Sequence, residues 1–205
     1  KQIQQTSIRE VILEHKLLTR IGSLDTKSLL SLVDATLAAG MSPVLQWDIL
    51  STEQNFQRCV TLLNRLPITN FHAIRVQDLG AAEWIRLKHP ELPLHLIAET
   101  GNHNLTGLQR WTKYFGQQLQ RLILSTELPK PVLSEYSKIL NVPCEILAVG
   151  RILLLYTPRK LLSYQAFSSG STKFLEKTLA TSDQPQKQFP TIENQHGTFM
   201  FHHRD

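Results

Sequence analysis

Hydrophobic and polar positions along the chain repeat one short unit: an apolar run, a polar corner, and then a segment with apolar residues at helical spacing. Apolar runs bounded by polar corners are typical of buried strands, and apolar residues recurring every three or four positions predict amphipathic helices. The predicted strands are residues 10–14, 43–47, 71–78, 94–98, 121–124 and 144–149. Because strands and helices alternate at a spacing of about 25 residues, the sequence predicts an α/β fold with a parallel sheet and crossover helices.

The regularity of this repeat favours a parallel (β/α) TIM-like barrel over an open doubly wound sheet. No glycine-rich phosphate-binding fingerprint follows any strand, which removes the commonest reason to choose a Rossmann fold. Eight strands close a (β/α) barrel. The six readable strands therefore predict an incomplete barrel, with its gap filled by the C-terminal hairpin, by a second copy of the chain, or by sequence beyond the given ends.

The repeat stops after Ser163, and this sets the expected organisation of the chain. We expect (β/α) barrel units over residues 1–167, a loop or linker over residues 168–188, and a C-terminal β-hairpin segment of the same domain over residues 189–205. The linker is rich in Ser, Thr, Gln and Asp, which are residues typical of loops. The turn of the hairpin is predicted near Gly197.

Composition narrows the functional classes. The chain has 205 residues and a net charge of +5, which permits contact with RNA without arguing for it, because no run of Lys or Arg is present. The two cysteines, Cys59 and Cys144, lie in apolar patterns typical of buried free thiols, which fits a reducing compartment. No apolar run reaches the length of a membrane span and residues 1–6 are polar, so we expect a cytoplasmic protein without membrane contact.

Polar side chains follow the predicted strands, and parallel strands bring such positions to one end of a barrel. The candidate ligand-binding residues are Arg75, Gln77, Asp78, Asn102, His103, Gly150, Arg151 and Arg159, and the candidate catalytic residues are Glu99, Glu127 and Tyr156. A ring of mixed charge suits a polar or anionic ligand. The alternative interpretation is a solvated rim, because any barrel needs polar residues where strands meet loops.

The loop at residues 99–104 is the most unusual of these corners. Its amides, imidazole and carboxylate precede a predicted helix, so the loop is a candidate anion site, unless one of its asparagines only caps that helix. His95, Glu99 and His103 are spaced by four residues, but this spacing crosses a strand and a loop rather than one helix face. We therefore expect no metal site. No serine lies in a nucleophile-elbow sequence, so nucleophilic catalysis is unsupported.

Residues 144–163 form a buried-strand pattern, then Gly150, then Tyr156, Arg159 and Leu161-Leu162-Ser163. This order resembles the signature of the family called the U32 peptidases, or collagenase-like proteases, which has a strand, Gly, a Cys three residues after it, Ser-Tyr-Ser-Gly-Arg-Cys and Leu-Leu-Ser.

Other segments extend the resemblance, and two positions depart from it. Residues 76–80, 122–128 and 189–201 resemble family segments, and the second of these places Glu127 at a family glutamate. Two signature cysteines are replaced, by Leu153 and Lys160.

The missing cysteines limit what the resemblance implies. Family members that hydroxylate RNA bases or a quinone ring hold an iron–sulfur cluster on four cysteine thiolates. This chain has two cysteines, neither in the signature, so four-cysteine ligation is excluded and no cofactor is expected.

The resemblance then implies a U32-peptidase-like protein without an iron–sulfur cluster. We expect it to bind a polar or anionic ligand at the strand C-terminal face, in a homo- or hetero-oligomer, as an accessory subunit to a catalytic relative. The alternatives are an active family enzyme, either a peptidase or an RNA- or quinone-modifying hydroxylase, and a non-catalytic RNA-binding module.

Overall fold

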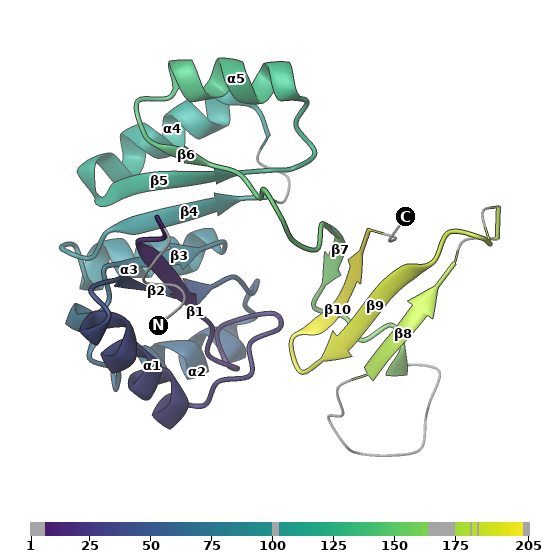
Figure 1. Cartoon of the computed structure of the whole chain (residues 1–205), viewed down its shortest axis with the longest axis horizontal. Helices are drawn as coiled ribbons and strands as arrows, with labels where there is room; N and C mark the ends of the chain where they lie inside the picture. The colour runs from purple at the N-terminus through teal and green to yellow at the C-terminus, as the bar shows by residue number, and fades with distance from the viewer. Residues whose placement is uncertain (1–6, 100–102, 164–174, 181, 184, 203–205) are drawn as a thin grey trace. The chain divides into compact units, whose positions relative to one another are not determined.

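The computed structural model describes residues 7–99, 103–163, 175–180, 182–183 and 185–202 (Figure 1). Backbone contacts divide the chain into two compact units, residues 1–146 and residues 147–205. The first unit is a mixed α/β unit around a parallel sheet, and the second is built on an antiparallel sheet.

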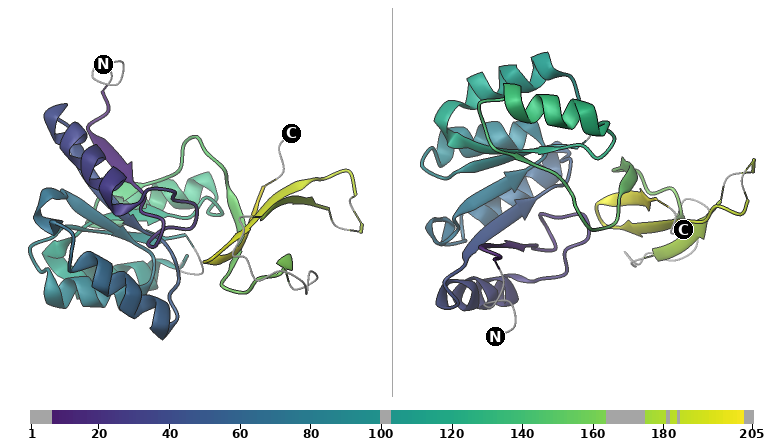
Figure 2. Two further views of the ribbon diagram at one scale, coloured as in Figure 1. Left: turned by 90° about the horizontal axis from the view of Figure 1, so that it is seen from below. Right: turned by 45° about the horizontal axis from the view of Figure 1, so that its top comes forward.

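The sheet of the first unit has six parallel strands in sequence order, β1-β2-β3-β4-β5-β6. The strands are β1 (Glu10–Leu13), β2 (Ser42–Trp47), β3 (Ala73–Val76), β4 (Leu94–Ala98), β5 (Leu119–Leu124) and β6 (Cys144–Glu145). The connecting helices are α1 (Thr26–Ala38), α2 (Glu53–Leu63), α3 (Leu79–Lys88), α4 (Leu105–Phe115) and α5 (Lys130–Ile139), with short 3-10 turns at Ile68–Asn70 and Gly116–Gln118. The sheet curls into a half-barrel with the helices on its outer face (Figures 1 and 2).

Side-chain caps fix where four of the helices begin. Asp25, Thr52, Asp78 and Asn104 each accept a hydrogen bond from the backbone N–H three residues later. These bonds satisfy donors that the first turn of a helix leaves unpaired. Asn104 is therefore the asparagine of the loop at residues 99–104 that caps α4.

Alternate residues of each strand face the helices and form the core. Leu45 and Trp47 of β2, and Ile74 of β3, are fully buried in one apolar cluster with helix residues such as Val33 and Ile85. Burying a side chain of this size contributes about 2 kcal/mol relative to exposing it. The strands of the half-barrel are therefore held mainly from outside, by their helices.

The intervening strand residues carry polar groups on the opposite, concave face. Gln46, Arg75, His95 and Arg121 are register partners across β2, β3, β4 and β5, so they form one row across the sheet. Since strand side chains alternate between the two faces, the row follows from the sequence alternation of apolar and polar residues. The space that a closed barrel fills with side chains is here lined by charged and amide groups.

An ion pair spans this concave face between strands that are not neighbours in the sheet. The Arg121 guanidinium of β5 donates to both carboxylate oxygens of Glu10 of β1, at 2.5 and 2.8 Å. The hydrogen bonds from Arg121 lower the pKa of Glu10 more than burial raises it. The pair therefore stabilises the curled sheet at pH values above the ordinary pKa of Glu. This stabilisation is lost as the pH falls through the lowered pKa of Glu10.

The second unit contains a four-stranded antiparallel sheet in the order β7-β10-β9-β8. Its strands are β7 (Leu153–Thr157), β8 (Leu175–Leu179), β9 (Phe189–Asn194) and β10 (Gly197–Phe201). The predicted hairpin is confirmed as β9 and β10. Gly197 has a φ of 123°, and an added Cβ would lie 2.0 Å from the Thr157 carbonyl oxygen, so only glycine fits this position.

Three sequence predictions were wrong in detail. The strand predicted at residues 144–149 ends at Glu145, and Val149 is 93% exposed. No strand was predicted within residues 168–188, yet β8 forms there by pairing with β9, although its own sequence lacks an apolar alternation. The hairpin pairs with β7 and β8, so it does not supply a missing strand of the parallel sheet.

The bridge between β1 and β5 can be tested by removing its guanidinium. Arg121→Ala should lower the free energy of unfolding by about 1–2 kcal/mol, or about 3–6 °C in melting temperature, because the half-buried pair has bidentate geometry. The matched control is Arg86→Ala, which removes a bidentate pair with Glu83 inside the single helix α3 and should cost less because that pair joins no separate strands. Thermal melts followed by circular dichroism measure both variants, and equal losses would contradict the bridging role.

Candidate functional site

Three arginines organise the charged groups of the concave face. Besides its pair with Glu10, Arg121 donates to Glu145 of β6 at 3.1 Å. Arg75 donates through Nε to Gln46 at 2.9 Å and through Nη1 to Glu145 at 2.6 Å. Each guanidinium thus connects strands through charge-assisted hydrogen bonds, which are roughly twice as strong as neutral ones.

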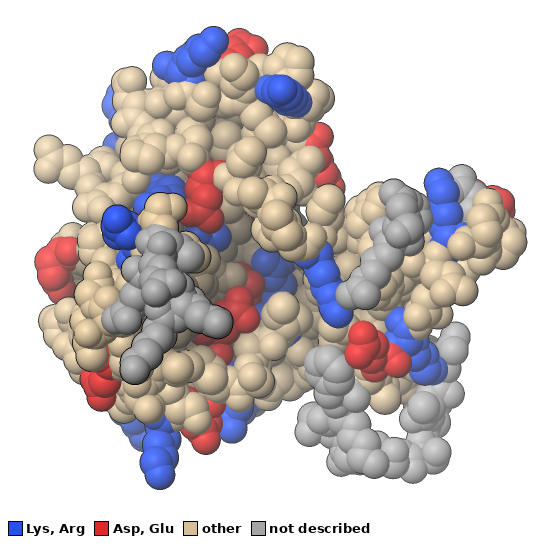
Figure 3. All heavy atoms as spheres, in the orientation of Figure 1, with Lys and Arg blue, Asp and Glu red and all other residues tan. Residues whose placement is uncertain are grey.

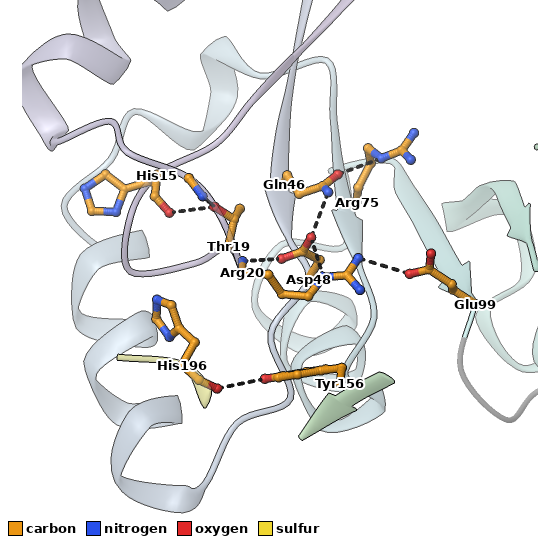
Figure 4. A network of polar contacts seen from close by, with 10 residues as sticks. His15, Thr19, Arg20, Gln46, Asp48, Arg75, Glu99, Tyr156 and His196 are labelled. Atoms are coloured by element: carbon orange, nitrogen blue, oxygen red, sulfur yellow. Dashed lines mark hydrogen bonds and ion pairs between the residues drawn. The ribbon is translucent and has the colours of Figure 1, made fainter. Parts of the chain in front are cut away.

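The third arginine, Arg20, lies in the segment after β1 and joins two strand ends (Figure 4). Its backbone N–H donates to Asp48 Oδ1 at 2.8 Å and its Nε to Asp48 Oδ2 at 3.0 Å, while Nη2 donates to Glu99 at 3.0 Å. Burial acts to lower the pKa of Arg20, but the carboxylates of Asp48 and Glu99 together raise it by more, so the guanidinium is a fixed cation. Gln46 also donates to Asp48, which continues the network toward Arg75.

Glu14 is a carboxyl group at this strand end that the sequence reasoning missed. It lies directly after β1 and is half-buried, and its pKa is raised by burial and by Asp48 despite the opposing effect of Arg20 and Arg75. Within the described residues its carboxylate takes part in no hydrogen bond. The alternation of Glu10, Ile12 and Glu14 along the first strand was the signal that places Glu14 on the concave face.

His95 lies in the middle of the polar row. Its side chain is 2% exposed, and burial, together with Arg121, lowers its pKa to about 4. The imidazole is therefore neutral near pH 7. Among the residues the structure describes, Nδ1 has no hydrogen-bond partner, so one buried ring nitrogen can exchange a hydrogen bond with a bound molecule.

A second, more exposed group follows β4 and β5. His103 Nδ1 lies 3.7 Å from Glu127 Oε2, and His103 Nε2 lies 3.2 Å from the Glu99 carbonyl oxygen. Tyr136 donates to the His103 carbonyl and holds this corner to α5. The structure thus brings Glu99, His103 and Glu127 close together, whereas Asn102 lies outside the described residues.

Other predicted residues of the first unit have different surroundings. Arg75 belongs to the concave row, and Gln77 is buried just beyond it. Asp78 caps α3 through Ala81 N–H at 3.0 Å and accepts from Ser51 N–H at 3.2 Å. Both oxygens of Asp78 thus hold backbone groups.

The remaining predicted residues lie in the second unit. Tyr156 stacks on Phe199 with ring centroids 4.9 Å apart, and its hydroxyl donates to the His196 carbonyl at 3.4 Å (Figure 4). The Arg159 backbone N–H donates to Thr157 Oγ1, and its carbonyl accepts from Thr198.

The other two residues of this unit, Gly150 and Arg151, have apolar and aromatic neighbours. The Arg151 guanidinium lies 5.8 Å from the Phe201 ring centroid, a separation typical of a cation–π contact. A Cβ added at Gly150 would lie 2.9 Å from a Leu147 methyl group.

A buried carboxylate fixes the Leu-Leu-Ser segment of the signature. Glu193 accepts from the backbone N–H groups of Leu162 at 2.6 Å and Ser163 at 3.0 Å, and from the Thr198 hydroxyl at 2.9 Å. Burial acts to raise the pKa of Glu193, but these hydrogen bonds lower it. The carboxylate is thus a positioning group for Leu162 and Ser163.

The thiols do not fit an iron–sulfur cluster. Cys59 is buried in α2, and burial raises its pKa to about 11; burial also raises the pKa of Cys144. Cluster ligation needs four thiolates, whereas these two groups favour the protonated form. Within the described ranges, no three His, Cys, Asp or Glu side chains are grouped in a way that could hold a metal ion.

No helix in the described part of the chain has both the length and the apolar character to cross a membrane.

Figure 3 shows acidic and basic side chains side by side around a hollow of the first unit.

Comparisons with known proteins agree with the signature. Residues 14–173, more than half of the chain, match the sequence profile of peptidase family U32. A solved structure, that of the U32 peptidase Mk0906, is similar with a TM-score of 0.49 at 11% identity, and the match covers 70% of this chain and 61% of that chain. The chain therefore spans less than two thirds of that protein. No curated protein matches the chain.

The raised pKa of Glu14 gives a prediction for stability against pH. A carboxyl group whose pKa is higher in the folded than in the unfolded state lowers the stability of the fold as pH rises. This loss begins at the ordinary pKa of 4.5 and continues through the raised pKa. Glu14→Gln removes the buried charge, so its melting temperature should be about 2 °C above that of the unmodified protein at pH 7. The difference should vanish below about pH 4, where both forms are neutral.

Thermal melts between pH 3 and pH 8 measure this difference. Glu135→Gln, in α5, is the control, and it should leave the melting temperature unchanged. A gain for Glu14→Gln that stays constant with pH would show that charge burial is not its cause.

Proposed function

The chain belongs to peptidase family U32, and we propose that it binds a polar ligand at the strand C-terminal face of its half-barrel without an iron–sulfur cluster. In this proposal the first unit is a partial (β/α) barrel, and its site lies where such barrels hold their ligands. The single observation that carries the proposal is the convergence of Glu14, Arg20, Asp48 and Glu99 at the ends of β1, β2 and β4.

The charge balance of this group favours one kind of polar ligand. Three carboxyl groups surround one guanidinium, and Arg20 is already paired with two of them. A ligand that offers amino or hydroxyl donors complements this excess, whereas an anion would meet repulsion from Asp48 and Glu99. Of the polar or anionic ligands expected from the sequence, the polar one is thus better supported.

The absence of the signature cysteines supports a role beside a catalytic relative. A chain with two protonated, separate thiols provides no cluster of its own, so redox chemistry of the cluster type would have to come from another subunit.

Binding can be tested with probes that differ in charge. Spermidine and triglycine should raise the melting temperature of the protein, and citrate should not. Glu99→Gln should weaken binding of the cationic probe by about tenfold, because it removes a charge at the strand end. Isothermal titration calorimetry gives the affinities.

The control variant for this test is Glu83→Gln, which removes an exposed carboxylate on α3. It should leave the affinity for spermidine unchanged. Binding of citrate alone, or equal effects of the two variants, would contradict a donor-bearing ligand at the strand ends.

The raised pKa of Glu14 beside Asp48 favours a second candidate function, acid–base catalysis in a hydrolysis reaction. A carboxyl group kept protonated to higher pH can donate a proton to a leaving group, while its charged neighbour holds water. Turnover of a peptide panel should then be lost by at least about a hundredfold in Glu14→Gln, while its melting temperature at pH 7 is not lowered. Equal turnover by both proteins would exclude this role.

A further inference from the structure

A groove on the first unit lies apart from the charged network of the concave face. It has a volume of about 830 Å³ and runs between the segment that joins β1 to α1 and the exposed side of α2. One wall contains His15, Lys16 and Thr26, and the floor contains Leu17 and Leu62. None of the residues placed in the strand-end network above lines this groove.

The floor of the groove is fixed by two hydrogen bonds to one loop residue. The Cys59 thiol of α2 donates to the Leu17 carbonyl at 3.4 Å. The Leu17 N–H donates to His15 Nδ1 at 3.1 Å, so the proton of the neutral imidazole is on Nε2, which can donate to Thr26 Oγ1 at 3.3 Å. Both walls are therefore tied to Leu17 without a ligand, which reduces the ordering that binding would require.

The charge of the groove is predominantly positive. Lys16, Arg58 and Arg65 contribute cations, and Asp25 contributes a carboxylate that already accepts the Ser28 N–H as the cap of α1. Within the described ranges, neither Arg58 nor Arg65 belongs to an ion pair. Among the described residues, two exposed guanidinium groups thus face the groove without an ion pair to the protein.

The spacing of the helix wall explains how these groups converge. Gln54, Arg58, Thr61 and Arg65 are spaced by three or four residues, which places them on one face of α2 and of the turn that follows it. Along this face the Thr61 hydroxyl lies between the two guanidinium groups, and the Gln54 amide precedes Arg58. Guanidinium forks match the oxygen geometry of phosphate groups and bind them with two parallel hydrogen bonds.

We propose that this groove binds a phosphate-bearing small molecule of about mononucleotide size. Arg58 and Arg65 hold the phosphate together with Lys16, the amide and hydroxyl groups of α2 bind its polar part, and Leu17 and Leu62 contact its apolar part. The volume lies within the range of about 300–1,000 Å³ that small-molecule sites have. The groove and the strand-end site use different residues, so the two proposals are independent.

The test compares AMP with adenosine, which lacks the phosphate, as probes of the full chain at low ionic strength. Isothermal titration calorimetry should show saturable binding of AMP and at least about tenfold weaker binding of adenosine, because the phosphate provides the charge-assisted contacts. Arg58→Gln combined with Arg65→Gln should weaken AMP binding by at least about tenfold.

The matched control removes two cations from another exposed helix face, by combining Arg110→Gln with Lys113→Gln in α4. This variant loses the same net charge and should bind AMP as the unmodified protein does. Far-ultraviolet circular dichroism verifies that both double variants are folded, and single variants replace a double variant that fails to fold.

Three results would overturn the proposal. The first is the absence of saturable AMP binding to the unmodified protein, and the second is equal weakening by the two double variants, which would show an unspecific effect of net charge. The third is binding of a single-stranded oligonucleotide that is tighter than binding of AMP, displaces AMP and weakens in Arg58→Gln with Arg65→Gln, which would assign the basic surface to a nucleic acid.

Discussion

The pairing of charges on the concave face is the interaction on which the curl of the parallel sheet depends, while the helices hold its strands from outside. Apolar side chains inside a curled sheet would pack without fixing one arrangement of its strands. Charged side chains in the same place must each lie beside a partner of opposite charge, because an unpaired charge in a low-dielectric site is costly. Arg121 meets Glu10 across the curl, and Arg75 and Arg20 do the same between other strands and strand ends. The positions of these partners define how far β1 and β5 can separate.

The same requirement places the candidate site. Asp48 and Glu99 are fixed by Arg20 before any ligand is present, and Glu14 remains the carboxyl group of this end without a hydrogen bond among the described residues. A ligand that binds there meets oriented acceptors that need no rearrangement. In the second unit, Glu193 has a comparable effect on the backbone of Leu162 and Ser163, so the signature segment of the family is shaped by a buried acid rather than by its own sequence alone.

The sequence predicted the six strands and five helices of the first unit because each has its own apolar pattern, and four of the helices also have their own cap. It also placed Arg75, Glu99, His103 and Glu127 near strand ends, since this needs only the strand alternation and the parallel sheet. It missed Glu14, although the alternation along the first strand places that residue on the concave face. It missed the bridging role of Arg121 because a pair separated by 111 residues leaves no local trace. For the same reason it missed β8, whose strand conformation comes from its pairing with β9 rather than from an alternation of its own.

The polar row also constrains insertions and deletions within the strands that carry Gln46, Arg75, His95 and Arg121. Side chains in a strand alternate with a period of two, so inserting one codon within β5 would exchange the places of Arg121 and Leu122. The guanidinium would then face the apolar layer under the helices while Glu10 lost its partner. A change of one residue within a strand therefore disturbs this row unless a bulge absorbs it, as the register shift between Leu94 and His95 does where β4 pairs with β5.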